Sequence, residues 1–86
     1  MDQDLGIKIY GAARCHKTQY YQQYFTDRQL AFTFLDVEEN EAYAAELRNL
    51  YASGKLNFPT LIIDGKKLRN PNEKQIEKQL QKREKV

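Results

Sequence analysis

The chain contains a single cysteine, Cys15, and its neighbours are residue types that make a thiol reactive. A thiol attacks a disulfide only as the thiolate, and a helix N-terminus or nearby positive charge lowers its pKa from about 8.5 to about 3.5–7.5. Arg14 and Lys17 add positive charge beside Cys15, and His16 adds more when it is protonated. We therefore interpret Cys15 as a nucleophilic thiol. The alternative is an inert cysteine packed where a strand meets a helix.

Thr18 lies one turn after Cys15, on the same face of a helix that begins at Cys15. Its hydroxyl can donate a hydrogen bond to the thiolate and stabilise the charge, but it cannot close a disulfide. Alternatively, the hydroxyl bonds back to a carbonyl of its own helix. His16 is a candidate proton relay, although an exposed histidine without a chemical role is the simpler interpretation. Because the chain has no second cysteine, a redox cycle of Cys15 needs an external thiol.

The composition predicts one soluble domain. The 86 residues suffice for a single domain over 1–86, with its core at about 5–80 and a charged C-terminal tail at 81–86. No apolar run approaches the roughly 18 residues of a membrane span. The acidic start Met1-Asp2-Gln3-Asp4 is unlike a signal peptide. We therefore expect a cytoplasmic protein with no membrane partner.

The charge of the chain is small overall but unevenly distributed. The net charge of +2 is too low to indicate nucleic acid as a partner. Residues 66–86 nevertheless carry eight Lys/Arg against three Asp/Glu. We interpret the stripe formed by Lys74, Lys78 and Lys82 as a solvated helix face, with an anion-binding patch as the alternative.

Two hydrophobic patterns alternate along the chain. Apolar runs rich in β-branched and aromatic residues predict four strands, at residues 5–10, 30–37, 60–63 and 66–68. Apolar residues at helical spacing predict three helices, which begin near residues 15, 41 and 71. Most of the six tyrosines fall at core positions of these helices, and we interpret them as packing residues. The order β-α-β-α-β-β-α predicts an α/β fold with a four-stranded mixed sheet flanked by three helices.

Turn and cap residues mark the ends of the later elements. Ser53-Gly54 is typical of a helix C-terminus. Asp64-Gly65 predicts a hairpin between the last two strands. At the last helix the sequence predicts Asn70 as the N-cap, Pro71 at the first helical position and Glu73 completing a capping-box-like pair.

Two segments together resemble the glutaredoxins. The first is Ile7-Lys8-Ile9-Tyr10, followed by a short loop and Cys15 at a helix start, and the second is Phe58-Pro59-Thr60-Leu61-Ile62-Ile63-Asp64-Gly65. The resemblance covers roughly residues 6–80 and implies a thioredoxin/glutaredoxin-like fold. In this chain Thr18 stands where the family's second cysteine would be, so it resembles a single-thiol member. Arg69-Asn70 replaces the usual Gly-Gly pair, and Gly11 replaces a basic residue upstream of the cysteine.

The resemblance also implies a substrate and a binding site. It implies a monothiol oxidoreductase that reduces glutathione mixed disulfides through Cys15, with glutathione as co-substrate and no bound metal. The Phe58-Pro59 bond would be cis, and the main chain of Phe58 would pair with glutathione or with a client peptide. Asn72 and Glu73 would hold the γ-glutamyl end of glutathione. The expected partners are glutathione and glutathionylated proteins, and the expected state is a monomer.

Two other functions stay open from the sequence. The first is a redox-silent binding module that uses the groove beside Pro59 without turnover. The second is an iron–sulfur glutaredoxin, in which two chains each give one thiolate to a cluster. The Gly-Phe-Ser residues that follow the cysteine in such proteins are replaced here by His16, Lys17 and Thr18, which makes this alternative weaker.

Overall fold

The computed structural model describes residues 6–82. Within this range the order of elements is β1 Ile7–Gly11, α1 His16–Asp27, β2 Thr33–Asp36, α2 Glu41–Asn49, β3 Thr60–Ile63, β4 Lys66–Arg69 and α3 Glu73–Gln81. Leu5, predicted to open the first strand, and residues 83–86 of the predicted tail lie outside the described residues. No helix between residues 6 and 82 is both long and apolar enough to cross a membrane.

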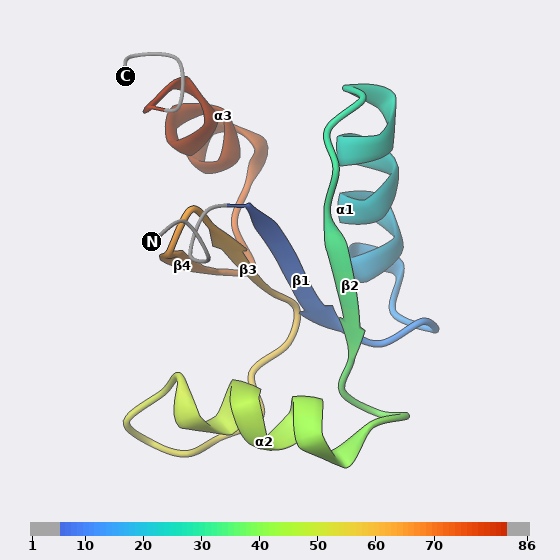
Figure 1. Cartoon of the computed structure of the whole chain (residues 1–86), viewed down its shortest axis with the longest axis vertical. Helices are drawn as coiled ribbons and strands as arrows, with labels where there is room; N and C mark the ends of the chain where they lie inside the picture. The colour runs from blue at the N-terminus through green and yellow to red at the C-terminus, as the bar shows by residue number, and fades with distance from the viewer. Residues whose placement is uncertain (1–5, 83–86) are drawn as a thin grey trace.

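The four strands form one mixed sheet in the order β2-β1-β3-β4 (Figure 1). β1 and β2 are parallel, as expected of a βαβ crossover, whereas β3 is antiparallel to both β1 and β4. Asp64 and Gly65 have φ angles of 50° and 88°, the left-handed conformation of a tight two-residue hairpin turn. The predicted fold class and element order are therefore confirmed.

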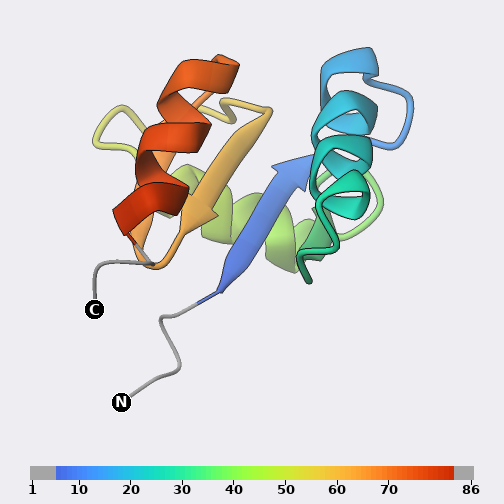
Figure 2. The ribbon, with the colours of Figure 1, turned by 90° about the horizontal axis from the view of Figure 1, so that it is seen from above.

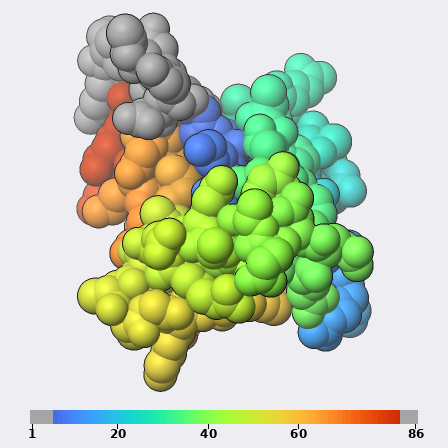
Figure 3. All heavy atoms as spheres, turned by 60° about the horizontal axis from the view of Figure 1, so that its bottom comes forward, coloured from blue at the N-terminus to red at the C-terminus, as the bar shows by residue number. Residues whose placement is uncertain are grey.

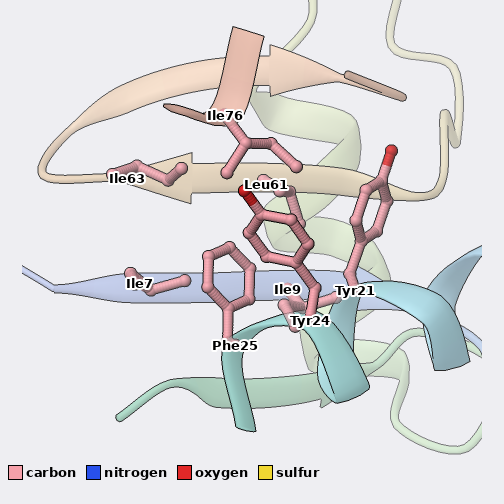
Figure 4. Packing of buried hydrophobic residues seen from close by; sticks show 8 residues of the cluster. All are labelled: Ile7, Ile9, Tyr21, Tyr24, Phe25, Leu61, Ile63 and Ile76. Atoms are coloured by element: carbon pink, nitrogen blue, oxygen red, sulfur yellow. The ribbon is translucent and has the colours of Figure 1, made fainter. Parts of the chain in front are cut away.

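The helices cover the two faces of the sheet unequally. α1 and α3 lie on one face and α2 lies on the other (Figure 2). Side chains alternate along a strand, so β1 and β3 contribute to both cores. The core under α1 and α3 consists of Ile7, Ile9, Tyr21, Tyr24, Phe25, Leu61, Ile63 and Ile76 (Figure 4). The smaller core under α2 consists of Tyr10, Leu35, Val37, Ala44 and Leu47. Figure 3 shows the outer surface of α2 and of the loop that follows it.

Two elements are shorter than predicted. The second strand begins at Thr33 rather than residue 30, because Gln29 adopts a positive φ of 59° and the Leu30 N–H still donates to the Phe25 carbonyl of α1. The second helix ends at Asn49, and the chain then tightens into turns in which the Tyr51 N–H donates to the Arg48 carbonyl. The positive φ of Gly54, 71°, falls after these turns and not at the helix end.

The predicted start of the last helix is wrong by two residues. Asn70 cannot be the N-cap, because its φ is 46° and an N-cap residue has extended backbone. Its N–H instead donates to the carbonyl of Pro59 at 3.0 Å. Asn72 is the N-cap, and it forms a capping box with Gln75 rather than with Glu73. The Asn70-Pro71 pair is therefore a tight connection from β4 to α3.

Candidate thiol active site

Cys15 lies in a short loop between β1 and α1. The loop is closed by a hydrogen bond from the Cys15 N–H to the Ala12 carbonyl at 3.0 Å and by one from the Gln19 side chain to the Ala13 carbonyl at 2.7 Å. Cys15 is the N-cap residue of α1 and is partly exposed. Its sulfur therefore lies beside the free N–H groups of the first helical turn while remaining accessible to a substrate.

Thr18 is the residue that ties this loop to the helix. Its side chain is completely buried. Its hydroxyl oxygen accepts a hydrogen bond from the Ala12 N–H at 3.3 Å. Since the oxygen serves as the acceptor for Ala12, the single hydroxyl proton remains available for the sulfur of Cys15. A hydrogen bond from this hydroxyl is the largest cause of the lowered pKa of the Cys15 thiol.

The remaining influences on the Cys15 thiol are smaller. Partial burial opposes ionisation, whereas the backbone N–H groups of Thr18 and Lys17 and the charge of Arg14 lower the thiol pKa further. The thiol makes no side-chain hydrogen bond that caps the helix. Taken together, the pKa of Cys15 lies below that of an ordinary thiol.

The three basic neighbours of Cys15 contribute less than the sequence suggested. The Arg14 guanidinium is paired with Glu38, with Nε 2.9 Å from the carboxylate, and its charge is the smallest of the influences on the thiol. The Lys17 ammonium lies 5.5 Å from the centre of the Tyr21 ring, so Lys17 acts on Cys15 through its backbone N–H. His16 is exposed and is not among the groups that shift the thiol pKa.

Gly11 is required by the position of Thr18. A Cβ atom at residue 11 would lie 2.3 Å from Oγ1 of Thr18 and 2.7 Å from its Cγ2. Contacts below 3.0 Å essentially never occur for real Cβ atoms, so any larger residue at position 11 displaces the Thr18 side chain. In the resemblance to the glutaredoxins, Gly11 stands out only because it replaces a basic residue. Its structural role is to leave room for the hydroxyl that bonds Cys15.

Pro59 lies at the same end of the sheet as the Cys15 loop. Tyr10 pairs with Thr60 across β1 and β3, so the chain leaving β1 toward Cys15 passes the residue that precedes β3. The Phe58-Pro59 peptide bond is cis. Within residues 6–82 the main chain of Phe58 forms no hydrogen bond, which leaves its N–H and C=O open to a ligand.

A second set of contacts fixes the turn before Pro59. The buried Thr60 hydroxyl donates to the Asn57 carbonyl at 2.7 Å, so the Tyr51 hydroxyl is the donor in its 2.8 Å hydrogen bond to Thr60. The Lys67 ammonium donates to the Leu50 carbonyl and lies 4.3 Å from the centre of the Tyr51 ring. Residues that directly follow α2, together with residues of β3 and β4, therefore hold this turn together.

The start of α3 is joined to α1 by tyrosine hydroxyls. Tyr21 donates to the Pro71 carbonyl at 2.7 Å, and Tyr20 donates to Glu73 at 2.8 Å. The expected ligand residue Glu73 therefore already accepts a hydrogen bond through one carboxylate oxygen. The side chain of Asn72 is engaged in the helix cap. The sequence did not predict these two hydroxyl contacts; buried Tyr21 carries a signal, because a tyrosine at a core position has a hydroxyl that needs a partner, whereas exposed Tyr20 carries none.

The structure thus brings three of the predicted groups to one end of the sheet, where β1 ends and β3 begins. Cys15 with Thr18, the Phe58-Pro59 turn, and the connection leading to Asn72 and Glu73 are linked through the strand register and through the bonds of Asn70 and Tyr21. Arg14 pairs instead with Glu38 at the turn before α2. Among residues 6–82, no group of three His, Cys, Asp or Glu side chains is arranged to hold a metal ion.

A sheet of this topology, with a cysteine at the N-terminus of α1, has the thioredoxin-like fold. A sequence model of the glutaredoxin family matches residues 7–68, most of the chain. The protein therefore belongs to the glutaredoxin family, of which it is a single-cysteine member. A comparison with curated proteins gave no match.

Solved structures share the fold at low sequence identity. A mutant of the thioredoxin-like protein BC3987 superposes with a TM-score of 0.73 at 21% identity, covering 88% of this chain and 95% of the other. The glutaredoxin grx-1 from Archaeoglobus fulgidus gives a TM-score of 0.72 at 14% identity, with 88% and 86% covered. A wheat glutaredoxin gives 0.63 at 14% identity, with 88% and 80% covered. These likenesses support the fold, while the family assignment comes from the sequence.

Proposed function

We propose that this glutaredoxin reduces mixed disulfides between glutathione and proteins by a monothiol mechanism centred on Cys15. The observation that carries the proposal is the bonding of Thr18. A buried hydroxyl, anchored by the Ala12 N–H, lies one turn from a partly exposed thiol and is the largest cause of its lowered pKa. A thiolate with this support is populated nearer neutral pH than an ordinary thiol and can attack a disulfide.

In the first step the Cys15 thiolate attacks the glutathione sulfur of the mixed disulfide. A new S–S bond forms between Cys15 and glutathione, and the bond between glutathione and the client protein breaks. The client cysteine leaves as a thiolate with the electron pair of the broken bond and takes a proton from solvent. The client is reduced, and Cys15 is now oxidised.

In the second step a free glutathione thiolate attacks the glutathione sulfur bound to Cys15. Oxidised glutathione leaves, and Cys15 returns to the thiolate state that Thr18 stabilises. An external thiol is needed because position 18 holds a hydroxyl, which cannot close a disulfide. The cycle requires one chain only, in line with the expectation of a monomer in a reducing compartment such as the cytoplasm.

The proposal assigns the other half of the site to binding. The open N–H and C=O of Phe58 would pair with the main chain of glutathione, in the manner of strand addition. The second carboxylate oxygen of Glu73 would accept a hydrogen bond from the ammonium group at the γ-glutamyl end of glutathione. The hydrogen bond from Tyr20 would orient the carboxylate. Asn72 would contribute through the N-terminus of α3. The use of glutathione itself rests on the family membership.

The test is the glutathione-dependent reduction of a glutathionylated peptide by the wild-type protein and by Cys15→Ser. We expect activity in the wild type and none in the variant, with the same circular dichroism spectrum for both. Equal binding of the peptide by both proteins without turnover in either would favour the redox-silent binding module. Visible absorbance in an anaerobic preparation that is lost in Cys15→Ser would favour the iron–sulfur alternative.

A further inference from the structure

β4 is an edge strand whose two faces differ. It pairs with β3 on one side only, so its outer N–H and C=O groups face outward at the edge of the sheet (Figure 1). The Lys67 side chain lies on the α2 face, where it contacts Leu50 and Tyr51. Because side chains alternate, Lys66 and Leu68 lie on the opposite face, which α3 covers. Half-buried Leu68 packs against the core on that face.

A surface groove of about 250 Å³ separates β4 from α3. It is lined by two residues of β4 and by one face of α3 with its C-cap: Lys66, Leu68, Gln75, Lys78, Gln79 and Lys82. The groove thus combines a half-buried apolar side chain, two amides and three ammonium groups beside an open strand edge.

The lysines of the groove are not neutralised within the described residues. The acidic residues of α3 lie on its other flank, where Glu73 bonds to Tyr20 of α1 and Glu77 bonds to Tyr24 of α1 and to Arg28 at the C-cap of α1. None of the ion pairs formed among residues 6–82 involves Lys66, Lys78 or Lys82. The side of α3 that faces α1 therefore carries its acidic side chains, which are bonded to residues of α1 and its C-cap. The side of α3 that faces β4 carries unbalanced positive charge.

The spacing of the lysines matches an extended chain. Lys78 and Lys82 are four residues apart on the helical path, which corresponds to an axial rise of about 6 Å. Alternate side chains on one face of a β-strand are about 6.6–6.8 Å apart. A strand added to β4 with a carboxylate at every second residue would therefore place successive carboxylates opposite successive lysines.

We propose that the groove between β4 and α3 docks an extended acidic segment of a partner protein, which adds to the sheet beside β4. Main-chain hydrogen bonds to the β4 edge would supply affinity, and carboxylates facing the groove lysines would supply specificity. A second copy of this chain does not fit, because pairing two β4 edges would bring like charges together. Leu68 and the strand edge favour a peptide over a nucleic acid, whose phosphates use neither feature.

The experiment measures fluorescence anisotropy of a labelled hexapeptide in which glutamate and valine alternate. The wild-type protein is compared with Lys78→Glu/Lys82→Glu. The matched control is Lys8→Glu/Lys55→Glu, which makes the same change in net charge at exposed lysines outside the groove. We expect the groove variant to bind about tenfold more weakly or worse, a difference of about 1.4 kcal/mol, and the control to bind within about twofold of the wild type.

Two further peptides test the mode of binding. A peptide of the same composition with three glutamates followed by three valines should bind more weakly, and so should the alternating peptide N-methylated at the amides that face β4. Equal binding of either one would overturn the strand-addition geometry. Equal loss in both protein variants, or tighter binding of a single-stranded oligonucleotide of the same charge, would overturn the acidic peptide as the occupant. Cys15→Ser should bind like the wild type, so this test is independent of the thiol chemistry.

Discussion

The two halves of the active site are built in different ways. The Cys15 half is mostly local, since the hydrogen bonds that hold its loop to α1 join residues between positions 12 and 19 and only the Arg14 side chain reaches out, to Glu38. The binding half is assembled from distant segments: the Asn70 N–H bonds to Pro59, and Tyr21 bonds to Pro71 across fifty positions of the chain. The half that performs chemistry is therefore determined by short-range geometry, whereas the half that binds depends on the packing of the whole fold.

This difference suggests separable functions. Damage to the Cys15 half should change the ionisation of the thiol and the rate of the chemical step. Damage to the binding half should change stability and substrate affinity while leaving the thiol pKa as it was. Substitutions in each half can therefore be assigned by measuring the thiol pKa alongside kcat and KM.

The largest effect is expected from Gly11→Ala. The new Cβ would lie 2.3 Å from the Thr18 hydroxyl oxygen, and Thr18 has no free space because it is completely buried. Overpacking of this kind costs about 1–3 kcal/mol, and we expect the upper part of that range in chemical denaturation. Displacement of Thr18 should also raise the pKa of Cys15 and lower kcat.

A double-mutant cycle with Thr18→Ala checks the cause, because alanine lacks both the oxygen and the methyl group that would lie 2.3 Å and 2.7 Å from the new Cβ. The combined loss of stability in Gly11→Ala/Thr18→Ala should be smaller than the sum of the two single losses. Simple additivity would show that the two side chains do not compete for the same space.

A smaller effect is expected from Tyr21→Phe, which removes one hydroxyl from the binding half. The Pro71 carbonyl loses its buried 2.7 Å hydrogen bond, which costs about 1 kcal/mol of stability. KM for the glutathionylated peptide should rise, while the pKa of Cys15 stays unchanged. Tyr43→Phe on α2, where the hydroxyl forms no hydrogen bond within residues 6–82, is the matched control. A shift of the thiol pKa in Tyr21→Phe would mean that the two halves are not separable.

The smallest effect is expected from Arg14→Ala, even though Arg14 is adjacent to the nucleophile. Its guanidinium is exposed and paired with Glu38, and solvent screens such exposed ion pairs so that they contribute little to stability. The pKa of Cys15 should rise only slightly, because Arg14 is the weakest of the groups that lower it. Arg48→Ala removes a comparable exposed pair with Glu41 and is the control for stability. A thiol pKa shift in Arg14→Ala as large as that of a Thr18 variant would contradict this ranking.

The same division explains how much could be predicted from the sequence. The element order, the hairpin at Asp64-Gly65 and Cys15 at a helix start depend on local patterns, and all three are found in the structure. The proposal that the Thr18 hydroxyl faces the thiolate also needed only helical spacing. Gly11 escaped notice because its contact with Thr18 depends on how the loop turns back on the helix.

The shortened second strand and second helix have local causes, whereas the errors at the last helix lie where distant segments meet. Asn70 was predicted as the N-cap because an Asn-Pro pair is typical of a helix start. In the structure its N–H donates to the Pro59 carbonyl, and Asn72 is the N-cap. Glu73 was predicted to complete the capping box, and its carboxylate instead accepts a hydrogen bond from the Tyr20 hydroxyl, while its role toward a ligand stays a prediction. No local pattern encodes these contacts, since their partners lie eleven or more positions away.

The central claim is that the Thr18 hydroxyl lowers the pKa of the Cys15 thiol and so favours the thiolate. The most direct measurement is the ultraviolet absorbance of the thiolate as a function of pH in wild type, Thr18→Val and Thr18→Ser. Because the pKa of Cys15 is lowered, the wild-type thiolate should form at lower pH than an ordinary thiol with a pKa of about 8.5. In Thr18→Val the transition should move up toward that value, with the pH profile of the reduction rate moving alongside it. Thr18→Ser, which keeps the hydroxyl, should stay near the wild type. A wild-type transition at the ordinary value, or identical transitions in folded wild type and Thr18→Val, would contradict the claim.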